Sequence, residues 1–232
     1  STTANYEVET YAPSAIFTIY DTKMKENETS QVDLVFREPV LLFSNSDITF
    51  PDLDNGTVSG TLSTMTSSDN ITWTGTFSPT FPETQDWTNA FTLASSYTDI
   101  VGNTGTAQTS VNFMIDDIEP TTIPTITLAD TTHLYGQNVW LTVVFPEPVD
   151  PSTFNNSDID ITDANGTLVS SMGSSDGNIT WRAYFRPTDN IEDVSNTISL
   201  GTAWTDQVGN AGIAAISSNF EVETTIPTAD NF

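Results

Sequence analysis

The chain has 232 residues, of which 37% are hydrophobic and 10% aromatic, and it contains no cysteine. That apolar content is enough for a packed core, and no apolar run approaches the roughly 18 residues of a membrane helix. Thirty-one acidic residues face five basic ones, for a net charge of −26. This charge excludes nucleic acid as a partner and argues against direct contact with an anionic membrane surface.

The excess of carboxylates has two interpretations. Surface acids keep a protein soluble or adapt it to salt. Alternatively, some of them form sites for a hard cation such as Ca²⁺, which binds carboxylate and carbonyl oxygens. Composition does not decide between the two. Without disulfides, the chain must take its rigidity from its core or from metal ions.

The first predicted strand lies at residues 5–10, because its sequence returns at residues 112–117 and again at residues 219–224. Asn5, Asn112 and Asn219 are each 107 residues apart. Self-similarity at a fixed period indicates tandem repeats. We interpret residues 1–12 as the terminal strand and linker of a preceding repeat, and we expect the segment to come from a longer array.

Residues 13–119 form the first predicted repeat, in which apolar residues recur at the two-residue period of a β-strand. Turn signals such as Asn55-Gly56 separate these runs. No stretch shows the period of a helix. The alternating apolar residues that predict strands facing a core are Val32, Leu34, Phe36, Ile71, Trp73, Phe77, Phe91, Leu93, Tyr97, Val111, Phe113 and Ile115.

Residues 120–232 form the second predicted repeat with a C-terminal linker. About seven short strands in about 107 residues are typical of a Greek-key sandwich, although the Cys…Trp…Cys pattern of antibody domains is absent. We therefore predict an all-β chain of two tandem immunoglobulin-like Greek-key β-sandwiches. The alternating apolar residues of this repeat are Val139, Leu141, Val143, Phe145, Ile179, Trp181, Phe185, Ile198, Leu200 and Trp204.

Six short motifs recur in the same order in both repeats: Phe-x-Glu-Pro-Val, Ser-Asp-Ile, Asn-Gly-Thr, Ile-Thr-Trp, Phe-x-Pro-Thr and Thr-Asp-x-x-Gly-Asn. In this order they resemble the bacterial Ig-like repeats, or extender domains, of giant secreted calcium-dependent surface adhesins. The resemblance covers essentially the whole chain. It implies an extracellular spacer at the bacterial cell surface, which holds a terminal ligand-binding region away from the cell.

The resemblance also implies Ca²⁺ at the joints between repeats. Neighbouring repeats of the same chain are then the expected partners, and we expect a monomer. One departure concerns the middle joint, residues 116–120, which reads Asp-Asp-Ile-Glu-Pro where the family often has Asp-Thr-Thr-x-Pro. The ligand at each joint therefore stays open.

The Greek-key topology predicts where a cation would bind. The incoming chain, the loop between the second and third strands (B–C loop) and the loop between the sixth and seventh (F–G loop) meet at one end of the sandwich. Acidic residues stand at all three places. The predicted ligands at the middle joint are Asp116, Asp117, Glu119, Glu147, Asp158, Asp206 and Asn210. Their counterparts in the first repeat are Glu7, Glu9, Glu38, Asp47, Asp99 and Asn103.

These residues also have structural interpretations. Asp99 and Asp206 are typical of Asx turns, in which the side chain accepts hydrogen bonds from its own loop. Asp47 and Asp158 are equally typical of a cap at a strand start. Asn103 and Asn210 follow a glycine, so we expect the backbone carbonyl rather than the side chain to be the ligand.

We expect no catalytic activity. The single histidine, His133, has no Cys or His partner for a zinc site, and we place it in an exposed loop. Paired carboxylates do not formally exclude a glycosidase, but a duplicated sandwich offers no unique cleft. Two other functions compete with the spacer: a module that itself binds glycan or host protein, and an accessory domain of a polysaccharide hydrolase. Trp87 and Trp140 are the only aromatic residues that we expect to be exposed.

Overall fold

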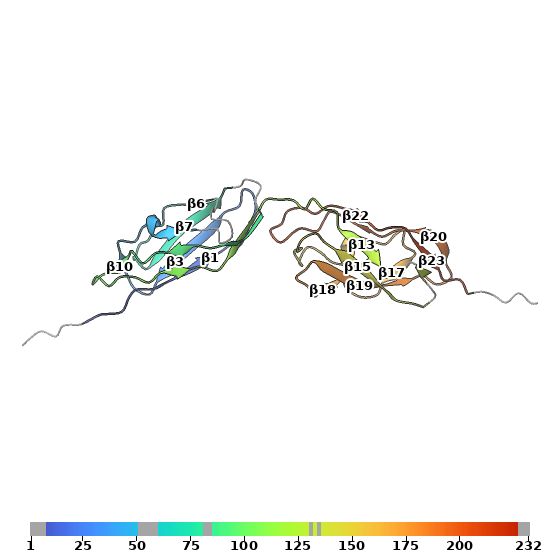
Figure 1. Ribbon diagram of the computed structural model, residues 1–232, viewed down its shortest axis with the longest axis horizontal. Coiled ribbons are helices and arrows are strands. Elements are labelled where there is room, and N and C mark those ends of the chain that lie inside the picture. Colours follow the sequence, from blue (N-terminus) through green and yellow to red (C-terminus); the bar gives the residue numbers. More distant parts are fainter. Residues whose placement is uncertain (1–7, 51–59, 81–84, 130–131, 134–135, 227–232) are drawn as a thin grey trace, which may run out of the picture. The chain divides into compact units, whose positions relative to one another are not determined.

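The computed structural model describes residues 8–50, 60–80, 85–129, 132–133 and 136–226. The chain divides into two compact units, Ser1–Ile118 and Glu119–Phe232. Each unit is a β-sandwich of short strands, and this confirms the predicted all-β fold of two Ig-like domains (Figure 1). No helix among the described residues has the length and apolar character needed to cross a membrane.

The larger sheet of unit 1 has the strand order β1-β3-β7-β6, with antiparallel neighbours (Figure 1). Between β3 and β6 the chain crosses to the opposite layer, where short strands pair as β11-β9-β5 and β2-β12-β8, while β10 pairs with β4. This crossover is the Greek-key connection. The elements of unit 1 are β1 (Ala15–Ile19), β2 (Lys23–Met24), β3 (Ser30–Phe36), β4 (Val40–Leu41), the 3₁₀ turn η1 (Asn45–Asp47), β5 (Ile48–Thr49), β6 (Gly60–Leu62), β7 (Thr72–Pro79), β8 (Gln85–Asn89), β9 (Thr92–Leu93), β10 (Thr98–Asp99), β11 (Gln108–Thr109) and β12 (Phe113–Asp116).

Unit 2 repeats this arrangement. Its larger sheet has the order β13-β15-β19-β17, with β18 also paired to β19, and its second layer contains β16-β21-β22 and β14-β23-β20. The elements are β13 (Thr125–Leu128), β14 (Thr132–His133), β15 (Val139–Val144), the 3₁₀ turn η2 (Asn156–Asp158), β16 (Ile159–Asp160), β17 (Gly166–Leu168), β18 (Gly173–Ser174), β19 (Thr180–Pro187), β20 (Glu192–Asn196), β21 (Ser199–Leu200), β22 (Ala215–Ile216) and β23 (Phe220–Glu223).

Each unit has its own apolar core, formed by the inward residues of alternating strands. Val32, Leu34 and Phe36 of β3 are at most 2% exposed, and the residues between them face outward. Phe36 contacts the ring of Tyr97 edge-on, with centroids 4.9 Å apart. Such close-packed aromatic rings fix the distance between the two layers, and with it the position of the loops at the sandwich end.

A glycine follows the F–G loop in both units and lies directly on a buried ring. A Cβ at Gly105 would stand 2.2 Å from the ring of Tyr97, and one at Gly212 would stand 2.2 Å from the ring of Trp204. The Tyr97 hydroxyl donates to Thr106 O (2.9 Å) and to Pro13 O (3.1 Å). The core of unit 1 therefore ties the incoming chain to the F–G loop.

Several expectations differ from the structure. Ile71 and Ile179, which we expected to face a core, are only partly buried. Val111 is 65% exposed, because it lies between β11 and β12, where the strand is interrupted. His133 does not lie in a loop: it belongs to β14, whose backbone pairs in parallel with β23. Trp73 is only partly buried, whereas its counterpart Trp181 is 6% exposed.

Candidate metal centre

The F–G loop of unit 1 is shaped by the carboxylate of Asp99. Its Oδ1 atom accepts hydrogen bonds from three successive backbone N–H groups, of Val101 (2.9 Å), Gly102 (2.7 Å) and Asn103 (2.9 Å). Gly102 has φ 98°, a conformation that favours glycine. One oxygen of Asp99 thus builds the loop, as the Asx-turn interpretation expects. The second oxygen, Oδ2, faces other side chains.

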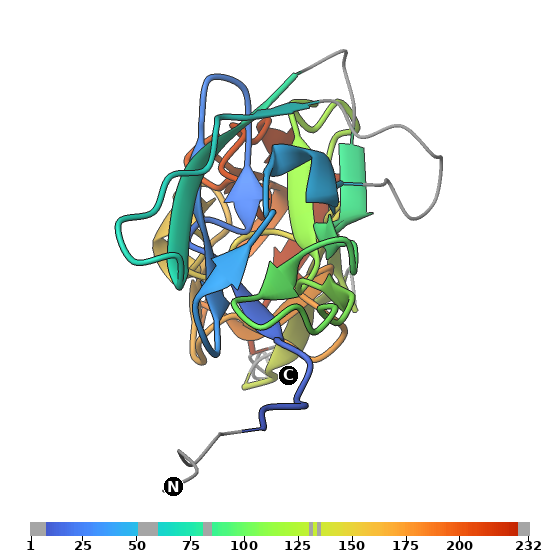
Figure 2. The same ribbon diagram turned by 90° about the vertical axis from the view of Figure 1, so that its left-hand side faces the viewer.

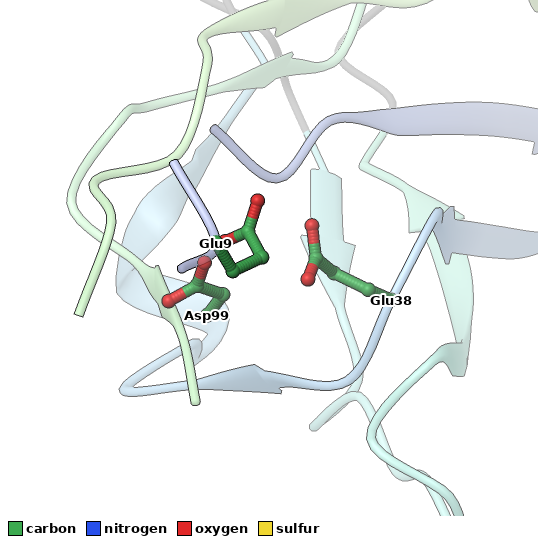
Figure 3. Close-up of side chains that lie close together, drawn as sticks. All are labelled: Glu9, Glu38 and Asp99. Carbon is green, nitrogen blue, oxygen red and sulfur yellow. The ribbon is translucent and has the colours of Figure 1, made fainter. Parts of the chain in front are cut away.

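Two glutamates from distant parts of the sequence join Asp99. Glu9 comes from the incoming segment, and Glu38 follows β3 in the B–C loop. One carboxylate oxygen from each of Glu9, Glu38 and Asp99 lies within 4.8 Å of the others. Figure 3 shows the three carboxylates turned toward one another, and Figure 2 looks onto this end of unit 1, which the dark-blue segment enters. We call these three residues the acidic cluster.

The acidic cluster brings three acidic side chains close together. Loss of hydration raises the pKa of Glu38 above its ordinary value, and the negative charges of Glu9 and Asp99 raise it further. Partial desolvation also opposes ionisation of Asp99. Hydrogen bonds from the side chain and backbone of Asn103 outweigh that effect and hold the pKa of Asp99 below its ordinary value. No positively charged side chain contributes to either shift.

The amide of Asn103 lies among these carboxylates. Its Nδ2 atom donates to Glu9 Oε2 (2.5 Å) and to Asp99 Oδ2 (2.7 Å). The backbone carbonyl of Asn103, which we expected to face an ion, instead accepts from the Asp99 N–H (3.1 Å). The loop thus closes on itself through that carbonyl, and the side chain faces the cluster. A carbonyl oxygen has a second lone pair, so the carbonyl as a ligand stays a prediction.

The donor set of the acidic cluster fits a hard divalent cation. Three carboxylates converge without a histidine or cysteine, and this excludes the usual zinc ligands among these residues. Ca²⁺ takes six to eight oxygen ligands from carboxylates, amide oxygens and water. A rotation of the Asn103 amide by about 180° would turn its oxygen toward such an ion, since the two orientations occupy the same space.

Unit 2 contains the same loop, built by Asp206. Its Oδ1 atom accepts from the N–H groups of Val208 (2.9 Å), Gly209 (2.8 Å) and Asn210 (2.9 Å). Asn210 Nδ2 donates to Asp206 Oδ2 (2.7 Å). A carboxylate oxygen of Glu147, the counterpart of Glu38, lies within 4.8 Å of one of Asp206. Unit 2 by itself therefore holds two carboxylates in the arrangement of Glu38 and Asp99.

The residues that begin the joint have different surroundings. Asp116 ends β12 and is 2% exposed, and it accepts hydrogen bonds from Gln85 Nε2 (2.9 Å) and from the Ile118 N–H (3.0 Å). Asp117 is half-buried and Glu119 is exposed. Glu7, also a predicted ligand, lies outside the described residues.

Asp47 and Asp158 lie apart from these carboxylates, in capping positions. Asp47 ends the turn η1, where its carboxylate accepts from the Ser44 N–H (2.8 Å) and from the Ser96 hydroxyl. Asp158 ends η2 and accepts from the Asn155 N–H (2.8 Å). Both carboxylates therefore close a local turn, which corresponds to the cap interpretation of these residues.

A groove lined by aromatic and polar side chains lies on unit 2, and the sequence analysis identified only part of it. Trp87 and Trp140 were expected to be the only exposed aromatic residues. Trp140 is 42% exposed on the outer face of β15, but Trp87 is half-buried, and Tyr11 and Tyr20 are 81% and 64% exposed. Tyr184 and Arg182, the neighbours of Trp140, were missed. The alternation in β19 could have found them, because Trp181, Ala183 and Phe185 face the core and the residues between them must face outward.

Solved structures that match this chain include three bacterial proteins. The chain is 12% identical to the Escherichia coli adhesin FdeC, over 90% of this chain and 64% of that one, with a TM-score of 0.45. It is 12% identical to the D00-D0 domain of intimin (90% and 99% covered, TM-score 0.36) and 16% identical to the Yersinia pseudotuberculosis adhesin InvE (91% and 59% covered, TM-score 0.30). The chain thus spans less than two thirds of the FdeC and InvE structures.

Among curated proteins, none matches this chain. The profile of one family matches it twice, at residues 9–115 and 116–222. These two matches together cover most of the chain, and each begins at an acidic residue that we identified as a candidate ligand, Glu9 or Asp116. The chain belongs to the bacterial Ig-like domain family, of which it carries two tandem copies.

Proposed function

We propose that this chain is an extender segment of a large bacterial cell-surface adhesin, without catalytic activity, and that Ca²⁺ bound at the joints between its repeats makes the array rigid. The acidic cluster Glu9–Glu38–Asp99 carries this proposal. Its carboxylates converge from three segments and match the ligand chemistry of Ca²⁺. Extracellular Ca²⁺ modules bind with dissociation constants of about 10⁻⁴–10⁻³ M, so weak sites suffice at a cell surface.

The position of Glu9 in the repeat supports a joint as the place of the cluster. Glu9, Asp116 and Glu223 are each 107 residues apart, and the latter two end the last strands of their units, β12 and β23. Glu9 therefore stands where the last strand of a preceding repeat would end. Each site then takes one acidic ligand from the preceding repeat and the others from the B–C and F–G loops of the following one.

The same rule predicts the ligands of the middle joint. Glu147 and Asp206 occupy the positions of Glu38 and Asp99, and Asp116 occupies that of Glu9. Without a cation, carboxylates at these positions repel one another. In the first repeat, loss of hydration raises the pKa of Glu38, and the charges of Glu9 and Asp99 raise it further. With Ca²⁺ bound, two repeats share one ion, and bending of the joint would break coordination. Interfaces between domains of one chain are otherwise mobile by default.

Small-angle X-ray scattering with and without Ca²⁺ tests this proposal. We expect an extended particle with a narrow distribution of shapes in millimolar Ca²⁺ and a broader distribution in chelator. The double variant Asp116→Ala, Asp206→Ala should give the chelator profile even in saturating Ca²⁺. The matched control is Glu26→Ala, Asp189→Ala, which removes the same charge at one exposed position of each unit, outside the predicted ligand positions. An identical scattering curve in every condition would show that packing alone fixes the joint and would refute the mechanism.

A further inference from the structure

The outer face of the larger sheet in unit 2 carries two stacked aromatic rings. Trp140 of β15 lies directly opposite Tyr184 of β19 in the sheet register. The ring centroids are 3.8 Å apart and the ring planes differ by 22°. The two side chains are 42% and 37% exposed. Large aromatic side chains are more often buried, so an exposed pair is a feature of binding surfaces.

The pair lines a groove of about 480 Å³, which is within the usual size range of ligand sites. Its other walls are polar. Arg182 follows the same outward row of β19 as Tyr184, while Ser170 and Asp176 come from the segment that precedes β19. The groove therefore combines an aromatic surface with a guanidinium, a carboxylate and hydroxyl groups.

The polar groups of the groove are held in place. Asp176 Oδ1 accepts from Ser174 Oγ (2.9 Å) and from the Thr180 N–H (2.9 Å), which orients the carboxylate. Hydrogen bonds from the side chain and backbone of Thr180 hold the pKa of Asp176 at about 2, so it is ionised at neutral pH. Ser170 Oγ accepts from the Tyr184 N–H (2.8 Å), which leaves the hydroxyl proton of Ser170 to donate to another group.

We propose that this groove binds a neutral glycan, with a sugar ring packed against Trp140 and Tyr184 and its hydroxyls bonded to Arg182, Asp176 and Ser170. A pyranose ring has an apolar C–H face that suits an aromatic surface, and a rim of hydroxyls that both donate and accept. The site pairs one positive with one negative side chain, so a neutral ligand leaves no charge unmatched. The net charge of −26 repels an anionic polysaccharide.

The first repeat lacks this site and serves as an internal comparison. Gln31 and Thr76 face each other there, at the positions of Trp140 and Tyr184. Asp33 and Thr74 replace the next pair, Thr142 and Arg182. A cavity of about 450 Å³ lies beside that sheet, but its lining is Thr, Ser and Asp without an aromatic ring. A cross-strand aromatic pair also stabilises a sheet by itself, so the test must separate binding from stability.

The experiment is a titration of the full chain, in millimolar Ca²⁺, with soluble neutral oligosaccharides. The probes are hexamers of α-1,4-glucose, β-1,4-glucose, β-1,4-N-acetylglucosamine and β-1,4-mannose. Binding is monitored by NMR through the five tryptophan indole N–H signals. We expect at least one hexamer to shift the Trp140 signal in a saturable way. Replacing the pair with the residues of the first repeat, Trp140→Gln with Tyr184→Thr, removes the reporting indole, so calorimetry measures the affinity of both proteins. We expect this replacement to weaken binding about tenfold or more.

Matched controls keep the result interpretable. Gln31→Ala with Thr76→Ala, at the equivalent positions of the first repeat, should leave binding unchanged. Arg182→Thr should weaken binding while the melting temperature stays the same, which a purely structural role of this row would not produce. Absence of saturable shifts with every neutral hexamer would overturn the proposal. So would binding that survives the Trp140/Tyr184 replacement, or binding of oligouronates only.

Discussion

The two repeats agree at their loops and differ on their sheet faces. Asp99 and Asp206 each accept three backbone N–H groups and one asparagine amide, with distances that agree within about 0.1 Å. On the outer sheet face, by contrast, Gln31 and Thr76 stand where the second repeat has Trp140 and Tyr184. The difference teaches that the F–G loop is common to both units, as the proposed joint sites require, whereas the aromatic pair belongs to one unit only.

The two repeats place different aromatic rings at the same position of the core, beneath the F–G loop. Beneath the F–G loop, unit 1 places Tyr97, whose hydroxyl reaches Pro13 and Thr106. Unit 2 places Trp204, whose Nε1 donates to Ile213 O (3.2 Å). Both rings need the following glycine, because a Cβ would stand 2.2 Å from the ring. The loop geometry is thus kept although the residue that supports it changes.

The largest expected effect follows from removing the carboxylate that builds this loop. Asp206 is fully buried, and Asp206→Ala removes the carboxylate oxygen that accepts from three backbone N–H groups. We expect the free energy of unfolding of the second repeat to fall by about 2–4 kcal/mol in chelator. Hydrogen exchange of the β19 amides at increasing denaturant concentration measures this free energy of unfolding.

Asp189→Ala, at an exposed position of the same repeat, is the control and should change stability little. Asp99→Ala should lower the stability of the first repeat in the same way, with β7 amides as the probe. If only one of the two aspartates matters, the loops are not equivalent and the comparison between repeats fails.

A smaller difference in the free energy of unfolding is expected between substitutions at the two tryptophans of the Ile-Thr-Trp motif. Trp181 Nε1 donates to Asn178 O (3.0 Å), whereas Trp73 Nε1 is buried without a hydrogen-bond partner among the described residues. Trp181→Phe should therefore cost about 1 kcal/mol more unfolding free energy than Trp73→Phe, which removes an unsatisfied donor. The same exchange experiment reports both, and equal costs would contradict the proposed difference.

The smallest effect concerns the turns before β7 and β19. Hydrogen bonds from Thr180 hold the pKa of Asp176 at about 2, below its ordinary value of 3.8. A lowered carboxyl pKa contributes stability that is present above the unfolded pKa and is lost as pH falls toward the folded one. Asp176→Asn should thus lower the melting temperature at about pH 6, and the difference from wild type should vanish between about pH 4 and pH 2.

Asp69, the counterpart in the first repeat, has its pKa lowered by N–H groups of Thr72 and Ile71 and by the Ser67 hydroxyl. Asp69→Asn should follow the same pH dependence. A difference between wild type and variant that is constant from pH 6 to pH 2, roughly, would mean that the charge plays no part in either turn.

Much of the fold could be predicted because the local pattern of apolar residues is enough to identify most strands. The alternation of Val32, Leu34 and Phe36 identifies a half-buried strand without reference to its neighbours. Val111 breaks the pattern because a strand interruption is set by its pairing partner, not by its own residues. His133 was placed in a loop because two residues that pair in parallel with a distant strand carry no local signal.

The location of the candidate site could be predicted from the topology, but the orientation of its side chains could not. The Greek key places Glu38 and Asp99 at one end of the sandwich. Topology does not say which group of Asn103 faces the cluster, because that depends on how the loop closes its own hydrogen bonds. Similarly, the pairing of Trp140 with Tyr184 requires the register of two strands.

A calcium titration of wild type and Glu38→Gln tests the central claim most directly. In chelator, the variant should melt above wild type, because it removes a carboxylate whose pKa is raised by loss of hydration and by the charges of Glu9 and Asp99. In millimolar Ca²⁺ the order should reverse, because the variant binds the ion more weakly in calorimetry and gains less stability from it. An equal stabilisation of wild type by Na⁺ at matched ionic strength, or an unchanged Ca²⁺ affinity of Glu38→Gln, would contradict the account.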